Sequence, residues 1–217
     1  MASDTNLIGN VRPSGHEERD VAGALRDQAR PEGALRTMTT PALDLRLHAG
    51  RNYDKGRGLL WQVAWHVVSH AVFQKWWLPA RLRPAILRSF GATIGQDVLI
   101  RQQVRIHWPW RLRIQGPAWI GHGVWILNLD EVVIEPHACV SQEAMLCTGS
   151  HDRHDPAFEH RNGPITVRKG AWVCARSVAL AGTDIGEHAL VEAGVTVRGR
   201  VAPGAVVTAA SVAAPRL

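Results

Sequence analysis

The residues from Cys147 to Pro156 carry the side chains best suited to chemistry in this 217-residue sequence. His151 lies near the middle of this run, and a neutral imidazole can take a proton from a hydroxyl near neutral pH. Asp152 or Asp155 could orient the ring, and the local sequence leaves both open. The same residues, together with His154, could instead bind a metal or be polar loop residues only, but zinc sites usually have a more regular ligand set. We therefore expect His151 to act as a general base and expect no metal.

A six-residue repeat surrounds this run and must position it. An aliphatic residue recurs at Ile94, Ile100, Ile106, Ile114, Ile120, Ile126, Ile134, Val140, Leu146, Val167, Val173, Ala179, Ile185, Val191 and Val197. A last hexad is expected to begin at Pro203. A period of six fits neither an α-helix nor a flat strand, and it is typical of a parallel β-helix whose aliphatic residues fill the interior. We therefore predict an all-β, three-sided β-helix.

The repeat is interrupted after Ile106, after Ile126 and, at greatest length, after Leu146, each time after three complete hexads. A three-sided coil of about eighteen residues places all three insertions at one corner. A long loop inside a regular solenoid is usually functional. We expect a well-defined position for His151 at its root and looser positions for His154 and His160.

The chain before the repeat divides into two parts. Residues 1–58 lack a sustained apolar face and are predicted to be disordered or irregular. Residues 59–90 are predicted to be helical, with one helix from Leu59 to about Leu78 and a short one from Pro84 to Phe90. The apolar stripe of the first helix comprises Trp61, Trp65, Val68, Val72 and Trp76. This segment would cap the β-helix of residues 91–217, whose active-site loop is 147–166, and could also touch a membrane.

Charge and composition narrow the choice of partner and compartment. The formal net charge is +6, and residues 51–113 hold 11 basic residues but only Asp54 and Asp97 as acids. This balance favours an anionic partner such as membrane headgroups, an anionic saccharide or a phosphorylated cofactor; nucleic acid is not expected, because no recognition motif accompanies the charge. Three cysteines and the absence of a signal or spanning pattern favour the cytoplasm. Trp108 and Trp110 are expected to point outward, for packing or for stacking on a sugar.

The sequence also resembles a known family. The hexads, the turn from Asn128 to Glu131, Ser141-Gln142, and above all Leu146-Cys147-Thr148-Gly149-Ser150-His151-Asp152 with Asp155-Pro156-Ala157-Phe158 are similar to the hexapeptide-repeat acyltransferases. Within that family the match is to the branch of colanic-acid and other exopolysaccharide O-acetyltransferases. The resemblance implies a left-handed β-helix, a homotrimer, and the use of acetyl-CoA to acetylate a sugar hydroxyl.

The resemblance further implies roles for individual residues. His151 takes the position of the catalytic histidine, and Asn128 and Asp130 would bind or orient the acceptor. Candidate cofactor-binding residues are Trp172, Ala175 and Ala193 along the pantetheine arm, and Arg198 and Arg200 near the phosphates. Relatives often carry Thr-Lys where this chain has Arg198-Gly199, and an Asn-Pro-Ala-type end where it has Ser211-Val212-Ala213.

Three functions follow as hypotheses. In the first, a sugar or lipid-linked glycan acceptor, deprotonated by His151, attacks acetyl-CoA directly, and Cys147 and Cys174 are only small β-helix residues. The second is a non-catalytic scaffold or saccharide-binding protein. The third is a metal hydrase like the γ-type carbonic anhydrases, although His122 and His137 do not reproduce the required spacing with His151.

Overall fold

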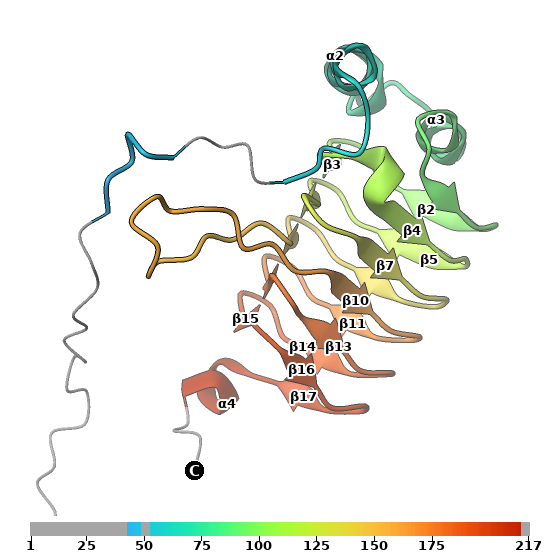
Figure 1. Ribbon diagram of the computed structural model, residues 1–217. Coiled ribbons are helices and arrows are strands. Elements are labelled where there is room, and N and C mark those ends of the chain that lie inside the picture. Colours follow the sequence, from blue (N-terminus) through green and yellow to red (C-terminus); the bar gives the residue numbers. More distant parts are fainter. Residues whose placement is uncertain (1–42, 49–52, 214–217) are drawn as a thin grey trace, which may run out of the picture. The chain divides into compact units, whose positions relative to one another are not determined.

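The computed structural model describes residues 43–48 and 53–213, which form a three-sided parallel β-helix preceded by a helical segment (Figure 1). Most of the predicted irregular region 1–58 lies outside the described residues. Its described parts, residues 43–48 and 53–58, consist of turns, bends and extended chain.

Each of the first five coils contributes one short strand to each of three parallel sheets, and the last coil contributes one strand to sheet A and one to sheet B. Sheet A consists of β1 (Thr93–Ile94), β4 (Leu112–Ile114), β7 (Val132–Ile134), β10 (Ile165–Val167), β13 (Asp184–Ile185) and β16 (Arg200–Val201). Sheet B consists of β2 (Val98–Ile100), β5 (Ala118–Ile120), β8 (Cys139–Val140), β11 (Trp172–Val173), β14 (Leu190–Val191) and β17 (Val206–Val207). Sheet C consists of β3 (Arg105–Ile106), β6 (Trp125–Leu127), β9 (Met145–Cys147), β12 (Val178–Leu180) and β15 (Thr196–Val197).

Aliphatic side chains stack inside the tube from one coil to the next. In sheet A, Ile94 pairs with Ile114 and Ile114 pairs with Ile134, in the register that the six-residue period requires. These side chains are buried, and the removal of their apolar surface from water is the main driving force for stacking the coils. The predicted parallel β-helix is therefore confirmed.

The last coil begins earlier than predicted. Val201, and not Pro203, pairs with Ile185 and is buried, so the assignment of the last hexad to Pro203 is wrong. Gly199 lies in the left-handed region at φ +77°, a conformation that glycine adopts without steric cost. The chain therefore turns more tightly after Val197 than it does at the other corners.

The three insertions all lie at the corner between sheets C and A, as predicted. The first contains the 3-10 turn η3 (Pro109–Arg111), the second spans residues 128–131, and the third spans residues 148–164. Strands β7 and β10 still pair in parallel across the longest insertion. The corner therefore holds extra chain without disturbing the sheets.

The helical segment packs three of its large side chains on the core of the β-helix. It comprises α2 (Leu59–Val68), the π-helical turn η1 (Ser69–Phe73), η2 (Ala80–Leu82) and α3 (Arg83–Ser89), and a short helix, α4 (Ala209–Ala213), follows β17. Trp65, Phe73 and Leu87 are fully buried in the same core as the β-helix, and the Trp65 indole N–H donates to the Ile106 carbonyl at 3.0 Å. None of the described helices is long and apolar enough to cross a membrane.

The first helical stretch is shorter than predicted. It ends at Phe73 instead of continuing to about Leu78, so Trp76 lies beyond it with 80% of its surface exposed. The buried Arg83 side chain donates to the carbonyls of Phe73 (3.1 Å) and Lys75 (2.7 Å). These bonds satisfy carbonyls at the end of the helix and hold the chain in a turn.

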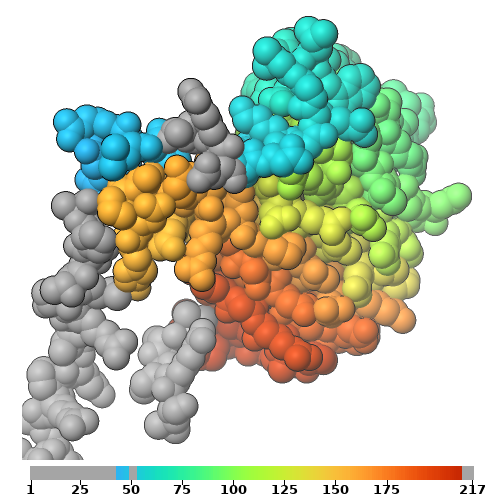
Figure 2. Space-filling model, in the orientation of Figure 1, coloured from blue at the N-terminus to red at the C-terminus, as the bar shows by residue number. Residues whose placement is uncertain are grey.

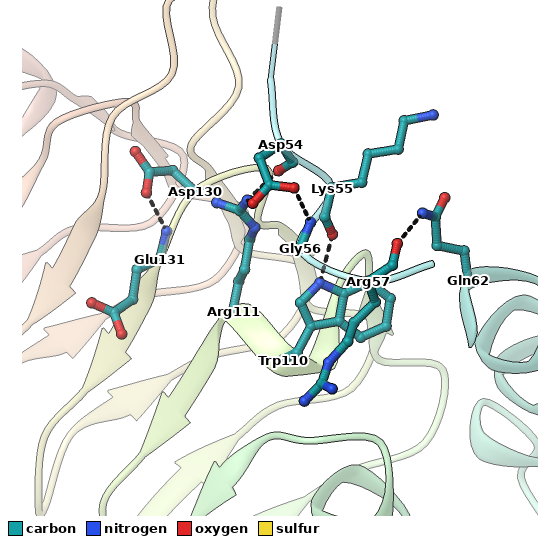
Figure 3. Close-up of polar contacts among 9 residues, drawn as sticks. All are labelled: Asp54, Lys55, Gly56, Arg57, Gln62, Trp110, Arg111, Asp130 and Glu131. Carbon is teal, nitrogen blue, oxygen red and sulfur yellow. Dashed lines mark hydrogen bonds and ion pairs between the residues drawn. The ribbon is translucent and has the colours of Figure 1, made fainter. Parts of the chain in front are cut away.

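The first insertion is packed inward. Trp108 is almost fully buried, and its ring stacks on that of Trp110 with 4.8 Å between centroids. The Trp110 indole N–H donates to the Lys55 carbonyl at 2.7 Å, and Arg111 donates to the Asp54 carbonyl (Figure 3). The expectation of two outward-pointing indoles is therefore wrong, because the core buries one and residues 53–58 contact the other.

Candidate active site

The long insertion between β9 and β10 is a hairpin that projects from the β-helix. Its two arms are joined by backbone hydrogen bonds from Arg161 to Ser150 (2.8 Å) and from Gly163 to Thr148 (3.0 Å), and by a β-bridge between His151 and His160. The Thr148 hydroxyl also donates to the Leu127 carbonyl of the preceding coil at 3.0 Å. His151 therefore lies on the paired root of the hairpin, close to the rigid β-helix.

A backbone carbonyl orients the His151 ring. Its Nδ1 lies 2.7 Å from the carbonyl oxygen of Phe158, which can only accept a hydrogen bond, so Nδ1 carries the proton of the neutral imidazole. The Phe158 ring stacks on the imidazole at 4.2 Å with an interplanar angle of 3°. The other ring nitrogen, Nε2, consequently keeps its lone pair and can accept a proton.

The acids expected to orient His151 have other partners. Asp152 accepts the backbone N–H of His154 at 2.9 Å and lies 3.9 Å from the Arg161 guanidinium. Asp155 accepts the backbone N–H of Ala157 at 2.9 Å. The expectation that Asp152 or Asp155 holds the His151 ring is therefore wrong, because both carboxylates stabilise the turn at the tip of the hairpin.

Asn128 and Asp130 lie at the second insertion, next to the root of the hairpin. Asn128 is fully buried; it accepts the Trp108 N–H at 2.9 Å and donates to the Trp108 carbonyl at 2.6 Å. The prediction that Asn128 binds or orients the acceptor substrate is therefore wrong, because both the oxygen and the nitrogen of its side-chain amide bond to the Trp108 backbone. Asp130 is partly exposed, and its carboxylate accepts the Glu131 N–H at 2.7 Å (Figure 3). The Asp130 N–H donates to the Thr148 hydroxyl at 2.9 Å.

The His151 side of the hairpin faces a groove of about 650 Å³. The lining includes Asn162 from the returning arm, Gly182 from the next coil, and Arg198 from the turn after β15. The structure thus brings one of the two predicted phosphate-binding arginines to the same groove as His151. Arg200, on β16, lines a different groove near the C-terminal end, which Arg198 also lines.

The remaining candidate cofactor residues lie on other faces of the β-helix. Ala175 and Ala193 line a groove of about 490 Å³ at the corner between sheets B and C. Trp172 is 47% exposed on the outer face of sheet B, and its indole N–H donates to the Ser141 hydroxyl at 2.8 Å. A single chain therefore does not bring these three residues to His151.

Two residues that the sequence did not single out complete the surroundings of His151. The centroid of the His48 ring lies 5.5 Å from that of His151 and 5.4 Å from that of His160. The centroid of the Tyr53 ring lies 5.0 Å from that of His160. Burial lowers the pKa of His160, and the charges that His151 and His48 can carry lower it further. His48 and Tyr53 do not belong to a local motif, so only the three-dimensional structure could reveal that they lie near His151 and His160.

Metal-binding side chains and cysteine thiols are two further candidates for chemistry in the described part of the chain. Among the described residues, no three histidine, cysteine or acidic side chains converge in a group that could hold a metal ion. Burial is the largest influence on the thiols of Cys139, Cys147 and Cys174, and it raises the pKa of each. A thiol with a raised pKa is a poor nucleophile near neutral pH.

The comparisons with known proteins place the fold and this site in context. No protein-family model matches the sequence. WcaF of Escherichia coli K12, whose name assigns it to colanic acid biosynthesis as an acetyltransferase, is 36% identical over 132 residues, which cover 59% of this chain and 71% of WcaF.

Solved structures share the fold. A hexapeptide-repeat acetyltransferase of Vibrio cholerae O1 biovar eltor, complexed with acetyl coenzyme A, has a TM-score of 0.62 and 20% identity, covering 74% of this chain and 90% of that one. A maltose O-acetyltransferase of Clostridium difficile 630 has a TM-score of 0.55 and 15% identity, covering 74% of this chain and 89% of that one. From its repeat, its fold and its similarity to WcaF, this chain belongs to the hexapeptide-repeat acetyltransferases, in the branch of the colanic acid biosynthesis enzymes.

Proposed function

We propose that this acetyltransferase takes its acetyl group from acetyl-CoA and transfers it to a hydroxyl of a sugar or lipid-linked glycan in exopolysaccharide or related glycan biosynthesis. The observation that carries this proposal is the 2.7 Å hydrogen bond between His151 Nδ1 and the Phe158 carbonyl, which leaves Nε2 free to accept a proton. The acetyl-CoA complex of the Vibrio cholerae relative and the maltose O-acetyltransferase of Clostridium difficile support the donor and the class of acceptor.

In the proposed reaction, His151 Nε2 removes the proton from the acceptor hydroxyl. The hydroxyl oxygen attacks the thioester carbonyl, and the tetrahedral intermediate collapses with cleavage of the C–S bond. His151 then returns the proton to the departing CoA thiolate, so no covalent enzyme intermediate forms. A general base contributes about 10²–10⁴ in rate, and the groove would supply much of the rest by holding both substrates together.

The test is acetyl transfer from labelled acetyl-CoA to a panel of free and lipid-linked glycans. His151→Ala should lower turnover by at least about 100-fold, because the proton acceptor is lost. His188→Ala, which removes an exposed histidine from another turn of the β-helix, is the matched control and should keep wild-type turnover. Turnover of His151→Ala within about threefold of wild type would refute the assignment.

We propose that a homotrimer completes the cofactor site, since Trp172, Ala175 and Ala193 lie on faces of the chain away from His151. A ladder of apolar side chains on the outer face of sheet B supports burial against another copy. The ladder consists of Leu99, Trp119, Cys139, Trp172, Leu190 and Val206, each paired in register with the next.

Light scattering tests this assembly. The wild type should have three times the mass of the chain, and Trp119→Lys, which places a charge in the ladder, should lower both the mass and the turnover. A fully active monomer would refute the trimer.

We further propose that the helical segment rests on the anionic cytoplasmic leaflet and keeps the enzyme at the inner face of the membrane. Exposed apolar side chains on α2 and on the turn after η1 support this; we refer to them as the apolar patch, and they are Leu59, Leu60, Val63, Val67, Trp76 and Trp77. Lys75 and Arg81 flank Trp76 and Trp77 in the sequence, which has no acidic residue between Lys55 and Gln96. An apolar face beside basic residues suits an anionic lipid surface, where each basic residue is worth about 1 kcal/mol.

Vesicle flotation tests the membrane proposal. The protein should float with vesicles that contain phosphatidylglycerol but not with pure phosphatidylcholine, and added salt should reverse the binding. Leu60→Ser with Trp76→Ser should weaken flotation, whereas Leu45→Ser, a change at an exposed leucine outside the patch, should not. Equal failure to float with both vesicle types at low salt would refute the contact, and a second copy would then be the better occupant of the patch.

A further inference from the structure

The segment 43–48, far from the active-site hairpin in sequence, is attached to the tip of that hairpin at two points (Figure 2, blue against orange). The backbone N–H of Asp44 donates to the Pro156 carbonyl at 2.9 Å, and His48 Nδ1 lies 3.1 Å from the Ala157 carbonyl. Because a carbonyl only accepts, His48 Nδ1 must carry a proton and donate it. A turn with a hydrogen bond from Leu47 to Asp44 fixes the spacing between the two attachments.

These two attachments adjoin the carbonyl that orients His151. Pro156, Ala157 and Phe158 are consecutive, and their carbonyls accept from Asp44, His48 and His151 in that order. Phe158 lies in the left-handed region at φ +51°, which is unfavourable for a residue with a bulky side chain. Such a conformation persists only where the surrounding contacts hold it, and the bond from His48 is one residue away.

The rings of His48, His151 and Phe158 are also in contact with one another. His48 meets both His151 and Phe158 edge-on, with centroids 5.5 and 6.5 Å away, while Phe158 stacks flat on His151. Phe158 thus fixes the imidazole by its carbonyl and its ring together, and His48 contacts both the neighbouring main chain and the two rings. His48 and the rings it touches are all partly buried.

We propose that His48 is a positioning residue for His151. It holds the carbonyl and the ring of Phe158 in the conformation that leaves the lone pair of His151 Nε2 available and orients the imidazole for catalysis. His48 is accordingly the residue of the segment 43–48 that supports the active site. This proposal rests on the proposed role of His151 as the general base.

Four variants of the full chain test the proposal. His48→Ala removes both the hydrogen-bond donor and the ring. His48→Asn keeps a hydrogen-bond donor near the position of Nδ1, and His48→Phe keeps an aromatic ring without the donor. Arg46→Ala is the matched control, because Arg46 lies on the same segment, is 90% exposed and, among the residues that the structure describes, forms an ion pair only with Asp44, a contact that contributes little.

The kinetic readout separates positioning from substrate binding. His48→Ala should lower kcat about tenfold, the effect of losing one partly buried hydrogen bond, and leave the KM for acetyl-CoA within about twofold. His48→Asn should recover at least about a third of the wild-type kcat, whereas His48→Phe should resemble His48→Ala, and Arg46→Ala should resemble wild type. An unchanged kcat in His48→Ala, or equal recovery by Phe and Asn, would overturn the proposal.

Hydrogen exchange distinguishes its failure from a failure of the proposed function, because it requires no turnover. In His48→Ala the hairpin amides of Asp152 and Phe158, which donate to Glu159 and Asp155, should exchange at least about tenfold faster, while the β-helix amide of Trp172 should not change. Exchange that is unchanged, or faster exchange with an unchanged kcat, would overturn the positioning role. An active His151→Ala would overturn the general base, whatever the exchange of the hairpin.

Discussion

Acid should destabilise this protein through His107, which follows β3. Its ring is partly buried, 4.2 Å from that of Trp108 and 6.1 Å from that of His66. Burial is the main cause that lowers its pKa from 6.5 to about 4, and positive charge on His66 and Lys55 adds to the effect. The folded protein therefore holds His107 neutral at a pH where the unfolded chain would protonate it.

The sign and size of the effect follow from this difference. Between pH 6.5 and about 4 the unfolded chain binds more protons at this residue, so the free energy of unfolding falls as the pH is lowered through that interval. A pKa lowered from 6.5 to about 4 corresponds to roughly 3 kcal/mol, at about 1.36 kcal/mol for each pH unit. Partial exposure of the ring to water reduces this, so we expect a contribution of about 2 kcal/mol.

Urea unfolding at a fixed protein concentration measures this contribution as the difference between wild type and His107→Gln, which stays neutral throughout. From about pH 7 to about pH 4.5 the wild type should lose about 2 kcal/mol more than His107→Gln. His188→Gln, at an exposed histidine, should lose as much as wild type. Equal losses in wild type and His107→Gln would show that the folded protein does not hold His107 neutral, and the reasoning would fail.

Three further predictions concern other parts of the chain. Asn128→Ala should lower the free energy of unfolding in urea by about 2–4 kcal/mol, because both backbone groups of Trp108 lose their partner; a loss below about 0.5 kcal/mol would contradict this. Arg198→Gln with Arg200→Gln should raise the KM for acetyl-CoA severalfold and leave that for the acceptor unchanged, and an unchanged KM for acetyl-CoA would reject the phosphate contact. Cys147→Ala should keep turnover within about threefold of wild type, since a partly buried thiol with a raised pKa is a poor nucleophile; a loss above about 100-fold would reverse that conclusion.

The β-helix could be predicted from the sequence because one physical constraint repeats along the chain. The inward position of each strand is filled by an aliphatic residue that stacks on the one before, so the period fixes strand register as well as fold. The phase of the insertions then locates the corner from which the active-site hairpin leaves. The prediction fails at Pro203, because the chain turns tightly at Gly199. This turn brings Val201, two residues earlier, to the inward position, and nothing in the preceding six-residue repeat indicates it.

The partners of the site residues could not be predicted in the same way. A carboxylate such as Asp152 is visible in a sequence, whereas every residue has a carbonyl, so nothing marks that of Phe158 as the acceptor for His151. His48 meets the hairpin across 109 residues of sequence, and no periodicity links the two. The end of the first helical stretch is likewise set by Arg83, through a tertiary contact that outweighs the helical spacing of Trp76.

The corner between sheets C and A offers a route by which enzymes of this architecture could change their acceptor. After β12 the chain turns there through Ala181 and Gly182 without an insertion, and both residues line the groove that His151 faces. A Cβ added at Gly182 would meet open space, although its backbone favours glycine at φ +79°. Residues inserted at this turn would form a new side of the groove, while β12 and β13 keep their strand pairings. The choice of acceptor can therefore change by insertion at this corner, without substitutions in the interior of the β-helix.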